Sequence, residues 1–386
     1  MPPLTRTPRQ GDWLDRVADP ELRRREPAPL LGVLPGEGIG PEVIDAALKV
    51  VRRLEQAGGQ AVTVKVGGPI GRDAERELGT ALSDDVVGFC EGIFERGGAI
   101  LSGPGGGRYV YELRRRLDLF LKISPIQVGN GLPDASPLRP ETLQGVDLLL
   151  LRENIGGIYQ GRSDEGVGAD GGRLVRHAFS YAEPPVRRFL DAAARLARSR
   201  RAELTVIAKE AGVPGVSGLW RKCANEASEE HEVRCTEVDV DLIAYRLMRE
   251  PQAFDVIAAP NLYGDVLGDL AAVLIGSRGL GFSGNFTPRG DAVYQTNHGA
   301  AYDIVGTDRA NPVGQILSMA MMLRESLGLE REARAVEEGV RRVWAEGWRT
   351  ADLDGPTAGH VVGTREMAAL VAGAAAEQLG VALDAA

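Results

Sequence analysis

The sequence has few cysteines, few lysines and no long apolar run. Its three cysteines, Cys90, Cys223 and Cys235, lack metal-site spacing and are too few for a disulfide framework, which favours a reducing, cytoplasmic compartment. No apolar stretch approaches the roughly 20 residues of a membrane span. Residues 1–29 lack the apolar core of a secretory signal, and we expect this extension to be loose or held against the surface.

The chain also lacks an excess of positive charge. Its 386 residues include 45 lysines and arginines against 54 aspartates and glutamates, a formal net charge of −9. This balance disfavours nucleic acid and anionic membranes as partners, although it allows a local basic pocket. Because only five basic residues are lysines, a lysine within an apolar strand is more informative than usual.

Short apolar runs alternate with amphipathic helical patterns, which predicts an α/β fold with a largely parallel sheet. The strand-like runs are residues 29–35, 61–66, 98–103, 145–152, 202–209 and 254–260. The helical patterns are residues 43–54, 182–200, 240–248 and most of the chain after Pro312. The polar, glycine-rich residues 160–174 predict a turn or an exposed arm.

Three glycines in "LPGEGIGPEV", Gly36, Gly38 and Gly40, suggest a dinucleotide-binding turn. The Rossmann pattern G-x-G-x-x-G fails, because Pro41 occupies the third glycine position and offers no N–H to a pyrophosphate. From these residues alone, a simple tight turn between a strand and a helix is an equal alternative.

Two aspartates in "NLYGDVLGDLAAVL", Asp265 and Asp269, are four residues apart and share one face of a predicted helix. Such converging hard oxygens suit Mg²⁺ or Mn²⁺. A solvated acidic helix face is the alternative.

Basic residues follow or precede several predicted strands. Lys209 ends one strand, where burial would lower its pKa and make it a proton carrier, unless it only extends into solvent. Arg152 ends another, and both it and Arg114 suit a small carboxylate through bidentate contacts. We expect Arg115 and Arg116 to form a solvated basic face.

Together these segments resemble the isocitrate/isopropylmalate dehydrogenase family, whose members oxidise and decarboxylate 3-substituted malates. The motifs occur in the family's order over roughly residues 30–370: "LPGEGIGPEV", "LRRRLDLF", "RENIGGIYQG", "VDVDLIAYRL", "NLYGDVLGDLAA" and "HGAAYDIVGTDRANP". The resemblance implies a two-domain, three-layer fold with a mixed sheet. It predicts an extension at 1–29, a cofactor-binding domain at 30–119 and 276–386, and a small domain at 120–275 with the dimer interface and arm.

The resemblance also implies roles for individual residues. Lys209 and Tyr159 match the catalytic pair, and Asp241, Asp265 and Asp269 match the metal ligands, with Lys209 and Asp241 reaching in from the second subunit of a homodimer. Substrate contacts are implied at Arg114, Arg152, Tyr111 and Ser124. NAD contacts are implied at Ile39, His298, Gly299, Ala301, Asp303 and Asn311, and Asp303 matches the family's preference for NAD.

The implied reaction is NAD- and Mg²⁺- or Mn²⁺-dependent oxidation and decarboxylation of a malate-type acid. Lys209 would remove the hydroxyl proton and Tyr159 would protonate the carbanion left by CO₂. The alternatives are an isopropylmalate, homoisocitrate, isocitrate or tartrate dehydrogenase proper, a hydroxyacid dehydrogenase that releases no CO₂, and a non-catalytic regulatory subunit.

Several positions depart from the family pattern. Ser124 stands where the family's "N-x-R-P" segment carries a third substrate arginine, and either Lys122 or Arg108 could compensate. Ala211 replaces an asparagine and Glu37 an aspartate. These changes surround the substrate while the metal, lysine and tyrosine positions are kept, so we expect an unusual substrate.

Overall fold

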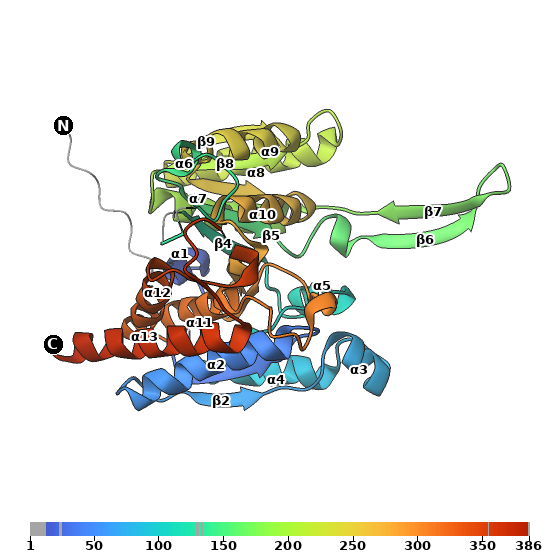
Figure 1. Cartoon of the computed structure of the whole chain (residues 1–386). Coiled ribbons are helices and arrows are strands. Elements are labelled where there is room, and N and C mark those ends of the chain that lie inside the picture. Colours follow the sequence, from blue (N-terminus) through green and yellow to red (C-terminus); the bar gives the residue numbers. More distant parts are fainter. Residues whose placement is uncertain (1–12, 23–24, 129–130, 133, 354, 385–386) are drawn as a thin grey trace, which may run out of the picture.

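The computed structural model describes residues 13–22, 25–128, 131–132, 134–353 and 355–384. These residues form a ten-stranded sheet of order β2-β1-β3-β12-β11-β4-β5-β10-β8-β9 (Figure 1). Its strands are β1 (Leu30–Leu34), β2 (Thr63–Val66), β3 (Ala99–Ser102), β4 (Leu121–Gln127), β5 (Asp147–Glu153), β8 (Glu203–Ala208), β9 (Arg234–Asp239), β10 (Val256–Ala259), β11 (Phe282–Phe286) and β12 (Ala292–Thr296). Neighbours are parallel in both outer parts and antiparallel around β4 and β11. The predicted mixed, largely parallel α/β sheet is therefore confirmed.

The chain builds one part of the sheet, leaves it, and returns. Strands β1 to β3 form one end, β4 leads to β5, β8, β9 and β10 at the other end, and β11 and β12 return between β3 and β4. The helices are α2 (Gly40–Gln56), α3 (Gly71–Leu78), α4 (Asp84–Phe94), α5 (Arg108–Arg116), α6 (Pro140–Leu143), α7 (Glu183–Arg198), α8 (Pro214–His231), α9 (Val240–Arg249), α10 (Asn261–Ile275), α11 (Val313–Glu325), α12 (Glu330–Ala345) and α13 (Thr364–Asp384). None of these described helices combines the length and apolar character needed to cross a membrane.

The glycine-rich segment forms a two-stranded arm. Strands β6 (Arg162–Val167) and β7 (Arg173–Ala178) pair in antiparallel register and project away from the rest of the molecule (Figure 1). Nearly all of their residues are exposed, because neither face of the hairpin packs against the body.

The described part of the N-terminal extension is held against the body. Helix α1 (Trp13–Val17) buries Trp13, Leu14 and Val17 in the main core. The backbone N–H groups of Trp13 and Leu14 both donate to the buried Glu325 carboxylate, at 3.1 and 3.2 Å. Residues 1–12 lie outside the described residues.

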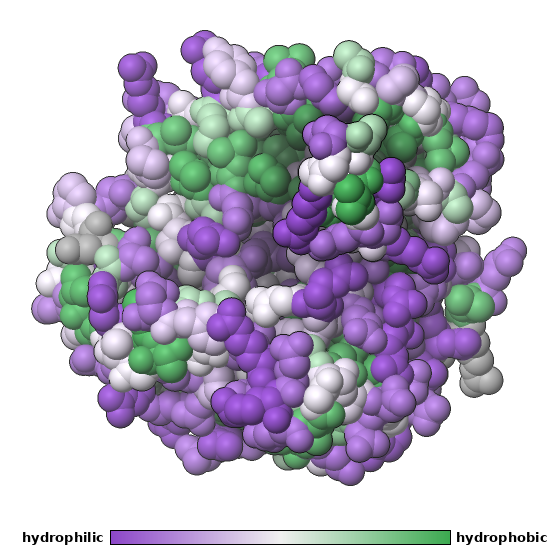
Figure 2. Space-filling model, turned by 90° about the vertical axis from the view of Figure 1, so that its right-hand side faces the viewer, coloured by the Kyte–Doolittle hydropathy of each residue, from purple (hydrophilic) through white to green (hydrophobic). Residues whose placement is uncertain are grey.

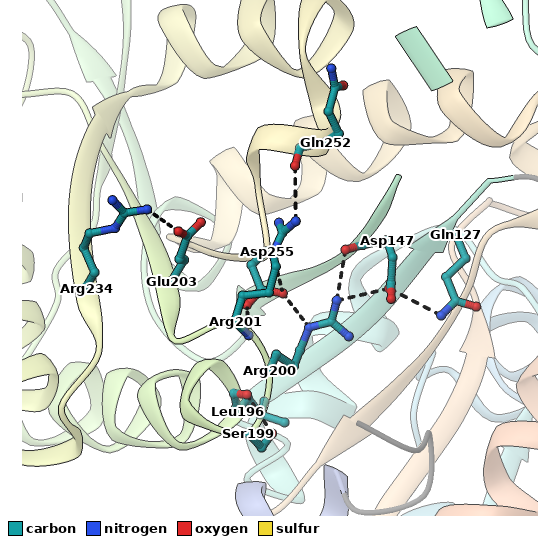
Figure 3. A network of polar contacts seen from close by, with 10 residues as sticks. All are labelled: Gln127, Asp147, Leu196, Ser199, Arg200, Arg201, Glu203, Arg234, Gln252 and Asp255. Atoms are coloured by element: carbon teal, nitrogen blue, oxygen red, sulfur yellow. Dashed lines mark hydrogen bonds and ion pairs between the residues drawn. The ribbon is translucent and has the colours of Figure 1, made fainter. Parts of the chain in front are cut away.

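A buried arginine ties together the beginnings of two strands, as Figure 3 shows. The Arg200 guanidinium donates to the fully buried Asp255 carboxylate at 2.7 Å and to the Asp147 side chain at 3.1 Å. Asp147 begins β5, and Asp255 immediately precedes β10. This network secures the amino ends of the strands, opposite the carboxyl ends where Arg152 and Lys209 lie. Ligands of open α/β sheets bind at carboxyl ends.

Candidate active site

Gly36 and Gly38 lie in the turn between β1 and α2, which we call the glycine turn, and this turn contacts two other loops. The backbone N–H of Ile39 donates to Ala300 O at 2.9 Å, and that of Glu37 donates to Pro104 O at 2.8 Å. Gly38 has a φ of +59°, and a Cβ there would lie 2.0 Å from Ala300 O. The glycines therefore permit close backbone contact between loops, while Pro41 lies in the first turn of α2.

The Glu37 carboxylate fastens these loops. It is buried and accepts from the Arg72 N–H at 2.7 Å, the Gly106 N–H at 3.0 Å and the Tyr302 hydroxyl at 2.9 Å. The three donors come from α3, the loop after β3 and the short 3₁₀ helix Tyr302–Ile304. One side chain thus joins three segments distant in sequence, a role that sequence analysis did not identify.

A polar cavity lies between β4, β5 and α10, and we call it the central cavity. Its lining residues are Lys122, Ser124, Leu150, Arg152, Gly264, Asp265, Gly268, Asp269 and Asn297. The face toward which the arm points is hollowed between its upper and lower parts, with apolar surface gathered above the hollow (Figure 2).

Asp265 is the centre of a contact network within this cavity. It forms an ion pair with Arg152 and accepts the Tyr159 hydroxyl at 2.9 Å. Burial acts to raise the pKa of Asp265, but Arg152 and the Tyr159 hydrogen bond outweigh it and hold that pKa below its usual value. Burial and the Asp265 contact raise the pKa of Tyr159, so its hydroxyl keeps its proton. Predicted metal, substrate and catalytic residues thus meet here.

Arg114 is the one arginine of its helical triplet that turns inward, as expected. It is buried, whereas Arg115 and Arg116 are exposed. Burial, together with the charge of Arg152, lowers the Arg114 pKa to about 9. Its guanidinium lies 5.7 Å from the ring centre of Tyr111, whose ring in turn packs at a tilt of 38° against Tyr159, with 4.9 Å between the ring centres.

Lys122 and Ser124 lie on one face of β4 and both line the central cavity. Ser124 donates to Asn297 Oδ1 at 3.4 Å. Lys122 is buried, and desolvation with the charges of Arg114 and Arg152 lowers its pKa well below the usual value. Arg108 instead is exposed and donates to Tyr159 O at 2.9 Å.

Lys209 does not line the central cavity and instead follows the end of β8. Its ammonium group contacts Asp241 at 2.6 Å and Asp239 at 3.3 Å. Our expectation that burial would lower its pKa is wrong for the single chain. The side chain is about a third exposed (34%), and the Asp241 hydrogen bond raises the pKa. Ala211 lies exposed in the turn that follows.

The predicted metal ligands have suitable chemistry but do not converge within one chain. Asp265 and Asp269 line the same cavity, and the lowered pKa of Asp265 keeps it ionised, as a hard oxygen ligand requires. Asp241 is engaged with Lys209 instead. Among the described residues, the group of ligand atoms found within 4.8 Å of one another is Asp191, Glu230 and His231, on other helices.

The predicted cofactor loop lies beside the glycine turn. Burial lowers the His298 pKa, so its imidazole is neutral, and its Nε2 is buried without a hydrogen-bond partner among the described residues. Gly299 has open space where a Cβ would be, and Ile39 packs with Ala301. An unpartnered ring nitrogen beside open backbone fits a bound dinucleotide.

The last two predicted cofactor residues, Asp303 and Asn311, differ in exposure and in their contacts. Asp303 is exposed in the short 3₁₀ helix Tyr302–Ile304. Asn311 is buried, donates to Asp352 at 3.1 Å and accepts from the Val313 N–H at 3.0 Å, so its contacts in this structure stabilise the start of α11.

Comparison with known proteins agrees with this geometry. A family model described as isocitrate/isopropylmalate dehydrogenase matches residues 30–371. The chain is 37% identical to 3-isopropylmalate dehydrogenase of Geobacillus kaustophilus (strain HTA426), over 87% of this chain and 93% of that protein. It is 38% identical to the enzyme of the same name from Anaeromyxobacter dehalogenans (strain 2CP-C), over 84% and 94%. The crystal structure of isocitrate dehydrogenase from Methylococcus capsulatus matches with a TM-score of 0.77 and 29% identity, over 91% of this chain and 99% of that one.

Proposed function

Because the chain belongs to the isocitrate/isopropylmalate dehydrogenase family, we propose that it oxidises and decarboxylates a 3-substituted malate. The cofactors are NAD and Mg²⁺ or Mn²⁺, and the products are a 2-oxo acid and CO₂. The enzyme works in the cytoplasm.

The observation that carries this proposal is a pair of buried guanidinium groups with free donors. Arg114 Nε and Arg152 Nη2 are buried without a hydrogen-bond partner among the described residues. Buried donors without partners cost stability, and a carboxylate ligand would satisfy both. A malate-type acid carries such carboxylates, so these groups bind and orient the substrate beside Asp265 and Tyr159.

The remaining residues divide the proton transfers. Tyr159, whose pKa is raised, holds a proton that it can donate to a carbanion. Lys209 accepts the hydroxyl proton of the substrate in its neutral form, which requires Asp241 to leave the contact that raises the Lys209 pKa and to bind the divalent ion instead. When bound between Asp241, Asp265 and Asp269, the divalent ion supplies Lewis-acid polarisation of the substrate oxygens, and NAD beside His298 and Asp303 supplies the hydride acceptor.

Two subunits complete each site in this proposal. Lys209 and Asp241 pair with each other, whereas Asp265 pairs with Arg152, as expected if the two clusters meet only across a dimer. Exposed apolar residues Leu242, Tyr245 and Val266 on α9 and α10 suit such an interface. In this proposal residues 120–275 form the small domain, which carries the interface and the arm, and the segments before and after it form the cofactor-binding domain.

Activity on a substrate panel tests the reaction. NADH and CO₂ are measured with Mn²⁺ for 3-isopropylmalate, isocitrate, tartrate, other 3-substituted malates and their phosphonate analogues, with NADP as the alternative cofactor. We expect equal amounts of NADH and CO₂ from one substrate class. NADH without CO₂ would show a simple hydroxyacid dehydrogenase, and no turnover would support a non-catalytic subunit.

Mixing two inactive variants tests the shared site. Lys209→Met and Asp265→Asn are each expected to abolish activity. If each site combines residues of both chains, randomly reassorted mixed dimers contain one intact site, and an equal mixture regains about a quarter of wild-type activity. If both residues act from one chain, the mixture stays inactive.

A further inference from the structure

Lys122 lies directly opposite a second buried cation. The antiparallel register of β4 and β5 pairs Lys122 with Arg152, so both side chains leave the same face of the sheet. Their exposed fractions are 6% and 4%. Like charges in directly opposed positions repel, and burial strengthens the repulsion because little water screens it.

A third cation and too few anions surround this pair. The charge of Arg114 acts on both Lys122 and Asp265. The carboxylates of the central cavity are already paired, Asp265 with Arg152 and Asp269 with Arg278, the latter at 2.9 Å. When Lys122 is protonated, the cluster of Arg114, Lys122 and Arg152 exceeds its protein counter-charge, and a bound anion would remove the imbalance and favour the charged lysine.

The wall next to Lys122 is neutral. Ser124, two residues along β4 and opposite Leu150, donates to Asn297 and carries no charge. Relative to an arginine at position 124, the cation has moved by two residues toward Arg152, roughly 7 Å along the strand. Positive charge is therefore concentrated at one end of the cavity, beside a neutral polar wall.

We propose that Lys122 is the third cationic contact to the substrate carboxylates and sets the enzyme's specificity. Resting on the function proposed above, the inference defines the substrate class: a dianionic hydroxy acid with carboxylates gathered between Arg114, Lys122 and Arg152. Its 3-substituent is uncharged but polar, unlike an isopropyl group, and it lies against the polar side chains of Ser124 and Asn297. The family's arginine segment and this lysine are thus alternative ways to hold a dianion.

Ligand binding by Lys122 variants tests the proposal without requiring turnover. Racemic malate is titrated by calorimetry into the full-length protein with Mn²⁺, and lactate serves as the monoanionic comparison. Lys122→Met keeps an unbranched side chain of similar length but removes the charge, whereas Lys122→Arg keeps the charge. Lys65→Met on the exposed strand β2 is the matched control. A charge-assisted contact predicts a 10- to 100-fold weaker malate Kd for Lys122→Met.

The other outcomes are equally defined. The malate Kd of Lys122→Arg should lie within a few-fold of the wild-type value, and that of Lys65→Met should be unchanged. The lactate Kd should differ little between Lys122→Met and wild type. Steady-state KM for the substrate found in the panel should rise with the malate Kd. An unchanged malate Kd in folded Lys122→Met overturns this inference but leaves the proposed reaction intact. Failure of the wild type to bind malate overturns the inference about Lys122, and the additional absence of turnover across the substrate panel overturns the proposed reaction as well.

The reverse exchange tests the specificity. Lys122→Asn combined with Ser124→Arg restores the family's N-x-R-P segment. Relative to Lys122→Asn alone, the double variant should have a higher kcat/KM for 3-isopropylmalate or isocitrate. Its kcat/KM for the native substrate class should be lower. Equal profiles for the two variants would contradict a role for these positions in specificity.

Discussion

The Tyr159 hydroxyl donates to Asp265 Oδ2 across 2.9 Å, which joins the proposed proton donor to a proposed metal ligand. These residues are 106 positions apart in sequence. Their contact orients the phenol toward the cavity in which Arg152 and Lys122 also lie. The chemistry of the site follows from this convergence.

Removing the Tyr159 hydroxyl should slow the reaction without unfolding the protein. For Tyr159→Phe we expect kcat to fall about 10²- to 10⁴-fold, the usual contribution of a positioned acid, with the substrate KM nearly unchanged. Because the pKa of Tyr159 is raised, ionisation of the tyrosine should cause no loss of wild-type activity below pH 10. Tyr294→Phe is the control, because it removes a hydroxyl that bonds at 2.7 Å to Ser326, a residue that does not line the central cavity. Full activity in Tyr159→Phe would exclude this role.

Neutralising Asp265 should remove metal-dependent stabilisation. Saturating Mn²⁺ with malate should raise the Tm of the wild type by about 3–8 °C, since ligand at 100 times its Kd adds about 2.7 kcal/mol. Asp265→Asn loses a charged ligand, and its shift should vanish, whereas exposed Asp45→Asn should respond normally. Differential scanning calorimetry measures both. An equal shift in Asp265→Asn would place the metal elsewhere.

Shortening Glu37 should weaken the cofactor site. Aspartate cannot span all three contacts to Arg72, Gly106 and Tyr302, so the loops around the glycine turn lose a common anchor. For Glu37→Asp we expect KM for NAD to rise about 3- to 30-fold, consistent with one or two lost hydrogen bonds. Malate binding should be retained. Glu91→Asp on the exposed face of α4 is the control, and an unaffected KM for NAD would restrict Glu37 to a purely structural role.

Stability should decline with rising pH because of Glu325. Burial raises its pKa to about 7, from 4.5 for the ordinary carboxyl. Between these values the folded state holds a proton that the unfolded state has released, so unfolding free energy falls as pH increases from about 4.5 to 7. We expect a loss of about 2–3 kcal/mol from this group.

Glu325→Gln should reduce that slope while still accepting the N–H groups of Trp13 and Leu14. Urea unfolding at pH 5 and pH 8 measures it, and exposed Glu77→Gln is the control. Glu153, whose pKa burial also raises to about 7, acts in the same direction, so part of the slope should remain. A slope unchanged by Glu325→Gln would show that Glu325 is ionised when folded.

Much of the architecture could be predicted from the sequence because local patterns encode it. Apolar runs corresponding to β1, β5, β8 and β10 were evident, and the spacing of Asp265 and Asp269 placed both on one helix face. Strands β4, β9, β11 and β12 were not recognised, since polar residues interrupt their apolar runs and Pro125 lies within β4.

The sequence by itself determined the α/β class, the order of elements and the residue types available for catalysis, because helical and strand periods are local properties. Only the tertiary structure decided which of them meet. The register of β4 on β5 places Lys122 opposite Arg152, although the two are 30 residues apart in the chain. Chain folding likewise places α1 against Glu325 and lets the Glu37 carboxylate accept hydrogen bonds from three separate segments. Such contacts depend on long-range pairing and burial, which no local pattern specifies.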